Sequence, residues 1–146
     1  MFADTSAVVK LYVDEIGAEP VWSVTGLTIS ELSRVELPAA LWCKHRAGEL
    51  SSESAGVLAG AFEADYYGSD GDSRFTVTRV SDPVVAMAAR LVARSDLRAG
   101  DAIQLASALL ARQAEPELTT FAAFDARLRT AAAVEGFALL PPTVAV

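Results

Sequence analysis

Stretches with strand character alternate with stretches of helical spacing along nearly the whole chain. The strand-like stretches are short and apolar, and they cover residues 1–4, 21–27, 75–80, 118–121 and 137–140. The stretches with helical spacing cover residues 5–13, 28–45, 51–66, 81–94, 100–113 and 125–134. Because parallel strands need long crossover connections, which are usually helices, this alternation predicts an α/β fold with a central, mostly parallel sheet covered on both faces.

Local signals predict several of the helix boundaries. Pro38 lies inside the helical pattern of residues 28–45, so a kink or a break is expected there. Ser51 or Ser52 is expected to cap the following helix. Residues 81–83 combine a capping serine, an acid and a first-turn proline, which together predict the start of another helix.

The length of 146 residues and an apolar content of 52% allow one domain with a sizeable core, so we expect a single domain over residues 1–146. No purely apolar run approaches the length that a membrane span needs, and the N-terminus lacks the pattern of a signal peptide. The one cysteine, Cys43, can form no internal disulfide. Together these features predict a soluble cytoplasmic protein.

The net charge of −7 is unfavourable for general nucleic-acid binding, because surfaces that bind phosphate are usually basic. The objection weakens if several of the acids belong to one metal site. Divalent cations held there would make that part of the surface attract phosphate. The charge therefore argues against a generic nucleic-acid-binding protein and leaves room for a metal-dependent one.

Four acidic residues from distant parts of the chain map to strand ends or to the helix turns beside them. They are Asp4, Glu36, Asp101 and Asp125. In open parallel sheets the ligand site lies beyond the carboxyl ends of the strands, so these four side chains are predicted to meet there.

Each of these acids also has a local interpretation. An aspartate at the start of a helix is commonly an N-cap or a partner of the helix dipole, and this applies to all three aspartates. Glu36 borders an apolar stripe, where it could pair with Arg34 or Lys10 or point to water. Glu31 competes with Glu36 for the functional role, but its position is typical of an exposed acid in the first turn of a helix.

Four carboxylates gathered without cations would repel one another, and some would have to be protonated. One or two divalent cations resolve this repulsion, and oxygen ligands at a partly open site suit Mg²⁺ or Mn²⁺. We therefore predict that Asp4, Glu36 and Asp101 hold a metal ion, directly or through water. Asp125 is predicted to complete the shell. Such a metal would lower the pKa of a bound water, whose proton could pass to a carboxylate.

Four segments resemble the motifs of the PIN-domain family, and especially those of VapC-type ribonuclease toxins. The segments are residues 2–12, 33–41, 97–106 and 121–128, and each contains one of the four acids. The resemblance implies a Rossmann-like α/β/α sandwich and an Mg²⁺- or Mn²⁺-dependent endoribonuclease in which the four acids are the catalytic and metal-binding residues. It also implies the toxin of a type II toxin–antitoxin system, with an RNA substrate, a VapB-type antitoxin as partner and a homodimeric assembly.

The segments depart from the family pattern in two places. Gln104 stands where the family often has histidine, so no chemistry is assigned to it. Residues 122–124 before Asp125 carry no hydroxyl, although a threonine or serine often precedes this acid in the family.

Two other functions stay open. A metal-dependent phosphatase or hydrolase of a small phosphorylated substrate also places acids at strand ends, although Ser6 stands where a haloacid-dehalogenase-like protein would have a second aspartate. A catalytically inactive PIN-fold binding module is the other, and the presence of all four acids argues against it. For a nuclease, Lys10 and Arg98 near the acidic motifs are the better candidates for contacts with the RNA backbone.

Overall fold

The sheet is parallel throughout the part of the chain that the computed structural model describes, which is residues 1–13, 26–68 and 71–143. The strands are β1 (Phe2–Ala3), β2 (Leu27–Ser30), β3 (Phe75–Thr78), β4 (Thr120–Ala122) and β5 (Ala138–Leu140). Their order in the sheet is β3-β2-β1-β4-β5, so the two-residue β1 lies in the centre. This arrangement confirms the predicted α/β fold class.

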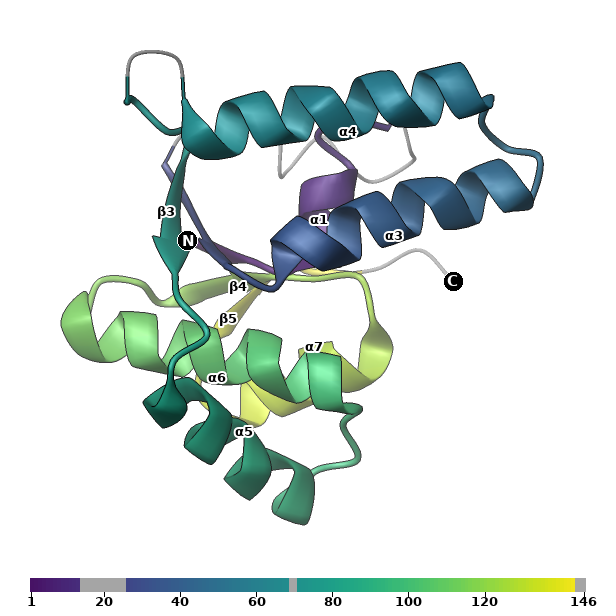
Figure 1. The fold of residues 1–146 in the computed structure, drawn as a ribbon. Coiled ribbons are helices and arrows are strands. Elements are labelled where there is room, and N and C mark those ends of the chain that lie inside the picture. Colours follow the sequence, from purple (N-terminus) through teal and green to yellow (C-terminus); the bar gives the residue numbers. More distant parts are fainter. Residues whose placement is uncertain (14–25, 69–70, 144–146) are drawn as a thin grey trace.

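Helices cover both faces of the sheet (Figure 1). On one face lie α1 (Thr5–Val9), α3 (Ser33–Arg46) and α4 (Ser52–Tyr67). On the other lie α5 (Asp82–Arg94), α6 (Ala99–Ala114) and α7 (Ala126–Val134). No helix in the described ranges combines the length and the apolar character that crossing a membrane requires.

The two residues of β1 bury their side chains in two different cores. Phe2 packs among α5, α6 and α7, where its ring stacks on that of Phe121 with the ring centres 5.5 Å apart. Ala3 packs on the opposite face against α1, α3 and α4. Because successive side chains of a strand point to opposite faces, even this short strand is anchored from both sides. The residue that follows it, Asp4, is therefore held at a fixed place above the middle of the sheet.

The position of the second strand differs from the sequence-based prediction. A strand over residues 21–27 was expected to lead directly into a helix at residue 28, but β2 spans Leu27–Ser30 and α3 begins at Ser33. Residues 21–25 lie outside the described part of the chain. The β-branched Thr28 and Ile29 suit a strand, and both are buried in the sheet, where β2 pairs with β3 along its whole length. Tertiary pairing thus overrides the helical spacing of the side chains at this point.

The predicted helix boundaries are mostly correct. Ser51 caps α4, where its hydroxyl accepts a hydrogen bond from the amide of Ser54 at 3.0 Å, and α5 begins at Asp82 as expected. The break expected at Pro38 is wrong, because α3 runs through this residue as one helix. Its missing N–H leaves only the carbonyl of Arg34 without a helical partner, and Arg34 is exposed to water.

The buried Arg129 of α7 joins the ends of two strands. One guanidinium nitrogen, Nη1, donates to the carbonyl of Ala123 at 2.8 Å. The other, Nη2, donates to the carbonyl of Pro141 at 2.7 Å. Because the guanidinium is a rigid fork of donors, it can satisfy the two carbonyls at once, and it fixes the turn after β4 against the segment after β5.

We predict that Arg129→Lys lowers the free energy of unfolding by about 2–3 kcal/mol, because the one nitrogen of lysine cannot take the places of both Nη1 and Nη2. Urea denaturation followed by circular dichroism measures this change. The matched control is Arg127→Lys, since the side chain of Arg127 is 58% exposed two residues earlier in the same helix. Equal stability of the two variants would show that the fork is not needed.

Candidate functional site

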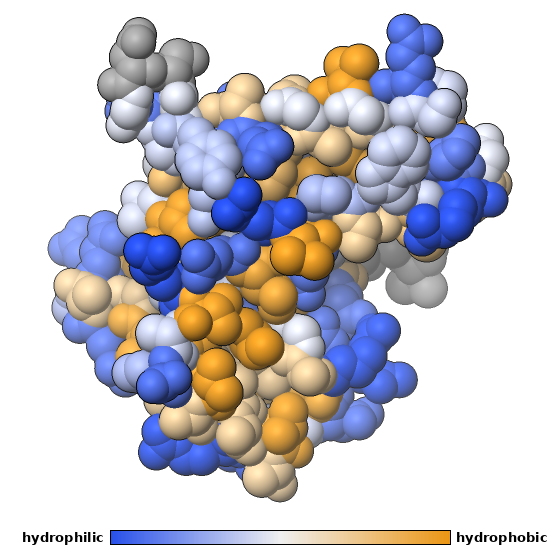
Figure 2. All heavy atoms as spheres, viewed as in Figure 1, coloured by the Kyte–Doolittle hydropathy of each residue, from blue (hydrophilic) through white to orange (hydrophobic). Residues whose placement is uncertain are grey.

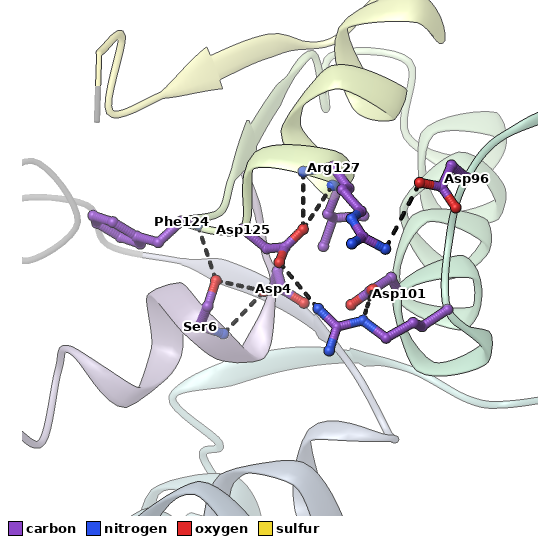
Figure 3. Close-up of polar contacts among 9 residues, drawn as sticks. Asp4, Ser6, Asp96, Asp101, Phe124, Asp125 and Arg127 are labelled. Atoms are coloured by element: carbon purple, nitrogen blue, oxygen red, sulfur yellow. Dashed lines mark hydrogen bonds and ion pairs between the residues drawn. The ribbon is translucent and has the colours of Figure 1, made fainter. Parts of the chain in front are cut away.

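Three of the four predicted acids lie together at the carboxyl edge of the sheet. Asp4 follows β1, Asp125 follows β4, and Asp101 lies in the first turn of α6. Figure 3 shows their side chains gathered around one space between α1, α6 and α7. The electrostatics agree with this proximity, since the charge of Asp101 acts on Asp4 and that of Asp125 acts on Asp101. The site therefore lies where a parallel sheet is expected to bind ligands.

Asp4 is a buried acid that also caps a helix. Its Oδ2 accepts hydrogen bonds from the backbone amide of Ser6 at 2.9 Å and from the Ser6 hydroxyl at 2.6 Å. The residue is only 5% exposed, and this burial raises its pKa to about 6, against the opposing effect of the Ser6 hydrogen bonds. The charges of Glu36 and Asp101 raise the pKa further. The N-cap interpretation is thus correct, but a cap alone needs neither burial nor two acidic neighbours.

Asp101 and Asp125 are bridged by Arg98. Its Nε lies 3.4 Å from Oδ2 of Asp101, and its Nη2 lies 3.3 Å from Oδ2 of Asp125. Burial raises the pKa of Asp101, as does the charge of Asp125, while Arg98 lowers it. The other oxygen of Asp125, Oδ1, caps α7 by accepting from the amides of Arg127 and Leu128. The positive charge that these two carboxylates require comes here from an arginine.

Glu36 lies on α3 at the border of the same site. Its Oε2 accepts hydrogen bonds from the hydroxyl of Thr5 and from the side-chain amide of Gln104, both at 2.7 Å. Its Oε1 is directed at the first turn of α6, where a Cβ on Gly100 would lie only 2.8 Å from it. The charge of Glu36 raises the pKa of Asp4, so the glutamate and this aspartate belong to one electrostatic group.

Glu31, the competitor of Glu36, has a different role. Its Oε2 accepts from the backbone amide of Val80 at 3.0 Å, and its Oε1 lies 3.9 Å from a guanidinium nitrogen of Arg79. The expectation that Glu31 is a first-turn helical acid is wrong, because it precedes α3 and binds the chain that follows β3. This contact fixes the connection after β3.

Sequence reasoning missed two polar residues of the site. Gln104 was assigned no chemistry, yet it contacts Glu36 directly, and the hydroxyl of Ser33 lies 2.9 Å from that of Thr5 in the same network. The available signal was the spacing of Gln104, one turn after Asp101 in an otherwise apolar stretch of α6. A polar side chain on a buried helix face needs a partner, and here the partner is 68 positions away in the sequence.

The residues suit a hard divalent cation in kind, but their side chains are not arranged around one. The four acids offer oxygen ligands, and Oδ2 of Asp101 is buried and accepts no hydrogen bond. Yet within residues 1–13, 26–68 and 71–143 no three Asp, Glu, His or Cys side chains come close enough together to hold a metal ion as they stand. Arg98 occupies the space between two of the acids. The assignment of Asp4, Glu36, Asp101 and Asp125 as metal ligands stays a prediction.

Comparison with known proteins identifies related families and folds. The family model described as PIN domain matches residues 1–134. A solved toxin–antitoxin complex from Klebsiella pneumoniae has a similar fold, with a TM-score of 0.54 and 16% sequence identity over 99% of this chain and 95% of that chain. At this identity the likeness is one of fold alone. A comparison with curated proteins gives no match.

We predict that Asp4→Asn stabilises the metal-free protein above pH 6. Asp4 has a raised pKa in the folded state, so folding is favoured while the acid is protonated, and this contribution is lost as pH rises from 3.8 through about 6. Asparagine keeps an oxygen for Ser6 without the buried charge. The variant should therefore gain up to about 3 kcal/mol over the wild type at pH 8, and little at pH 4.

Urea denaturation in EDTA at several pH values tests this expectation. Asp96→Asn is the matched control, because the side chain of Asp96 is 93% exposed. If Asp4→Asn and the wild type lose stability in parallel between pH 4 and 8, Asp4 is not the group responsible.

Proposed function

This chain belongs to the PIN domain family, and from that premise we propose that it is an endoribonuclease that depends on Mg²⁺ or Mn²⁺. Members of this family are generally nucleases. The observation that carries the proposal is the meeting of Asp4, Asp101 and Asp125 at the carboxyl edge of the sheet, with Glu36 beside them. So much negative charge in a partly buried place is costly for stability alone, and it suits a site that takes up a cation.

Asp4, Glu36, Asp101 and Asp125 are the residues that would hold the metal. A bound divalent ion supplies two things there, a water with a lowered pKa and positive charge for the phosphate oxygens. The protein's own part is to keep the carboxylates oriented and to accept the proton of the attacking water. Ser6 orients Asp4, and the amides at the start of α7 orient Asp125.

Cleavage by a pair of histidines, which activates the 2′-hydroxyl, is not available to this chain. Its one histidine, His45, lies in the last turn of α3, where Nδ1 is 3.0 Å from the carbonyl of Leu50. The nucleophile in our proposal is therefore water. We expect the attack of water on phosphorus to break the bond to the 3′-oxygen, which leaves as a hydroxyl group, so that the products carry a 5′-phosphate and a 3′-hydroxyl.

The two basic residues considered for RNA contacts differ in the structure. Lys10 is 8% exposed, and its Nζ lies 4.3 Å from the centre of the Phe124 ring, so it is badly placed to contact a phosphate. The side chain of Arg98 is 71% exposed at the edge of the acidic site. Its guanidinium can turn from the two carboxylates to a phosphate oxygen, so Arg98 is the candidate that we retain.

We further propose that the chain is the toxin of a type II toxin–antitoxin pair, with a VapB-type antitoxin and a homodimeric assembly. The similar fold in a toxin–antitoxin complex supports the pairing. Figure 2 shows apolar surface over α5 and α6 in the lower part of this face. The valines Val35, Val85 and Val92 are 69%, 50% and 44% exposed, and exposed apolar groups of this kind are common in protein interfaces.

We predict that Asp4→Asn and Asp101→Asn each lower RNA cleavage by more than about 100-fold, because each removes a proposed metal ligand. The assay follows labelled RNA in Mn²⁺, and circular dichroism verifies that the variants are folded. Asp96→Asn should cleave like the wild type. Full activity of either site variant would remove the basis of the proposal.

The same samples separate the alternative functions. Analysis of the product ends should find 5′-phosphates. Rapid hydrolysis of p-nitrophenyl phosphate without cleavage of RNA would favour the small-molecule phosphatase. Absence of Mn²⁺ binding in isothermal titration would favour the inactive binding module.

We predict that Arg98→Ala raises the KM for RNA and tightens Mn²⁺ binding, each by roughly fivefold. An exposed ion pair contributes up to about 1 kcal/mol, which corresponds to such a factor. Metal titration and steady-state kinetics measure the two effects separately. Arg127→Ala is the control, since Arg127 lies 3.7 Å from the exposed Asp96 and contacts none of the four acids through its side chain. A lower KM in Arg98→Ala would contradict the assignment.

A further inference from the structure

Gln104 forms the centre of a buried polar network next to the acidic site. It is 1% exposed, and its side-chain nitrogen Nε2 lies 2.7 Å from Oε2 of Glu36, 2.8 Å from the hydroxyl of Thr5 and 3.3 Å from that of Ser33. The Thr5 hydroxyl also donates to Oε2 of Glu36. Side chains from α1 and α6 thus converge on one carboxylate oxygen of α3.

Both donors act on the same oxygen of Glu36, which fixes the orientation of the whole carboxylate group. Hydrogen bonds to an ionised group are the stronger kind, and a partly buried carboxylate needs them. With Oε2 held by Thr5 and Gln104, Oε1 is left for another partner. That oxygen is directed at Gly100, the neighbour of Asp101 in the chain.

Gly100 provides the space that Oε1 of Glu36 occupies. A Cβ at this position would lie 2.8 Å from Oε1, closer than real Cβ contacts allow. The backbone of Gly100 is helical, so its conformation does not itself require glycine. In contrast, a Cβ on Gly60 of α4 would meet nothing within 4 Å. A Cβ at position 100 would thus force the Glu36 carboxylate to shift from the place where Thr5 and Gln104 hold it.

Stability alone does not explain the amide of Gln104. Its Oε1 is buried and has no hydrogen-bond partner, which costs free energy that a leucine of similar size would not. What the amide supplies is a donor to Glu36.

We propose that Gln104 and Gly100 are positioning residues for Glu36. Gln104, with Thr5, fixes one carboxylate oxygen, and Gly100 leaves room for the other to face the acidic site. This inference rests on the proposed function, because Glu36 is taken there to bind the metal. In this role both residues act through Glu36, and neither is assigned a catalytic step.

The first test uses Gln104→Leu, which removes the donor and keeps the volume. Isothermal titration with Mn²⁺ should show binding at least about tenfold weaker than in the wild type, the typical effect of losing a group that orients a ligand. The kcat for RNA should fall with it. The Tm in EDTA should change little, because the unpaired oxygen is lost as well. Ser107→Ala is the matched control, since Ser107 is equally buried on α6 but donates to the carbonyl of Ile103 and lies 2.9 Å from the hydroxyl of Ser30.

The second test uses Gly100→Ala, with Gly60→Ala as its control. Alanine favours helix, so a merely structural role predicts an unchanged or higher Tm and normal metal binding in both variants. Our inference predicts weaker Mn²⁺ binding in Gly100→Ala alone. Gly100→Ala therefore still tests the positioning role if Gln104→Leu does not fold.

The outcomes distinguish a failure of the positioning role from a failure of the proposed function. Normal Mn²⁺ affinity in both Gln104→Leu and Gly100→Ala, beside a wild type that binds and cleaves, overturns the positioning role and leaves the proposed function intact. Equal weakening by Ser107→Ala also overturns it, because α6 would then be loosened in general. A wild type that binds no Mn²⁺, or binds it equally well after Asp4→Asn, overturns the proposed function and the inference together.

Discussion

The structure around the carboxyl edge of the sheet is arranged to hold several carboxylates close together. Carboxylates this close repel one another, and burial makes the repulsion stronger. Each acid is accordingly held by its own donors. Ser6 holds Asp4, Arg98 bridges Asp101 and Asp125, and a hydroxyl with an amide holds Glu36. The donors come from α1, α6 and the turn before α6, so the site is built by the packing of helices against the central strand.

The central strand can be short because its neighbours hold it from both sides. Phe2 pairs with Thr28 of β2 on one side and with Phe121 of β4 on the other. The amide of Asp4 continues this pairing by donating to the carbonyl of Ala122 at 2.9 Å. The Ser6 hydroxyl accepts from the amide of Phe124 at 3.0 Å. Asp4 is therefore fixed to the strand that leads to Asp125, which is why two acids far apart in sequence stay close.

Much of this arrangement was predictable from the sequence, because it follows from local patterns. Alternating strand and helix signals predict the parallel sheet, and acids after the first and fourth described strands must then lie at one edge. The position of β2 was not predictable, because Thr28 and Ile29 fit a helical spacing as well as a strand. The role of Gln104 was hidden too, since its partner lies on another helix. Lys10 lies against Phe124, and Arg98 lies between Asp101 and Asp125. Both positions depend on side-chain packing, which the spacing of residues along the sequence does not show.

The four acids that meet at one edge of the sheet come from two separate parts of the chain, one before β3 and one after it. Asp4 follows β1 and Glu36 lies on α3, both before β3 in the chain. Asp101 in α6 and Asp125 at the start of α7 come after β3. A chain growing on the ribosome thus carries only two of the four acids until Asp101 has been made. The adjoining β4 and α7 complete the edge last. If the site cuts RNA, the order of synthesis itself delays the appearance of that activity until the segment that carries Asp125 has been made.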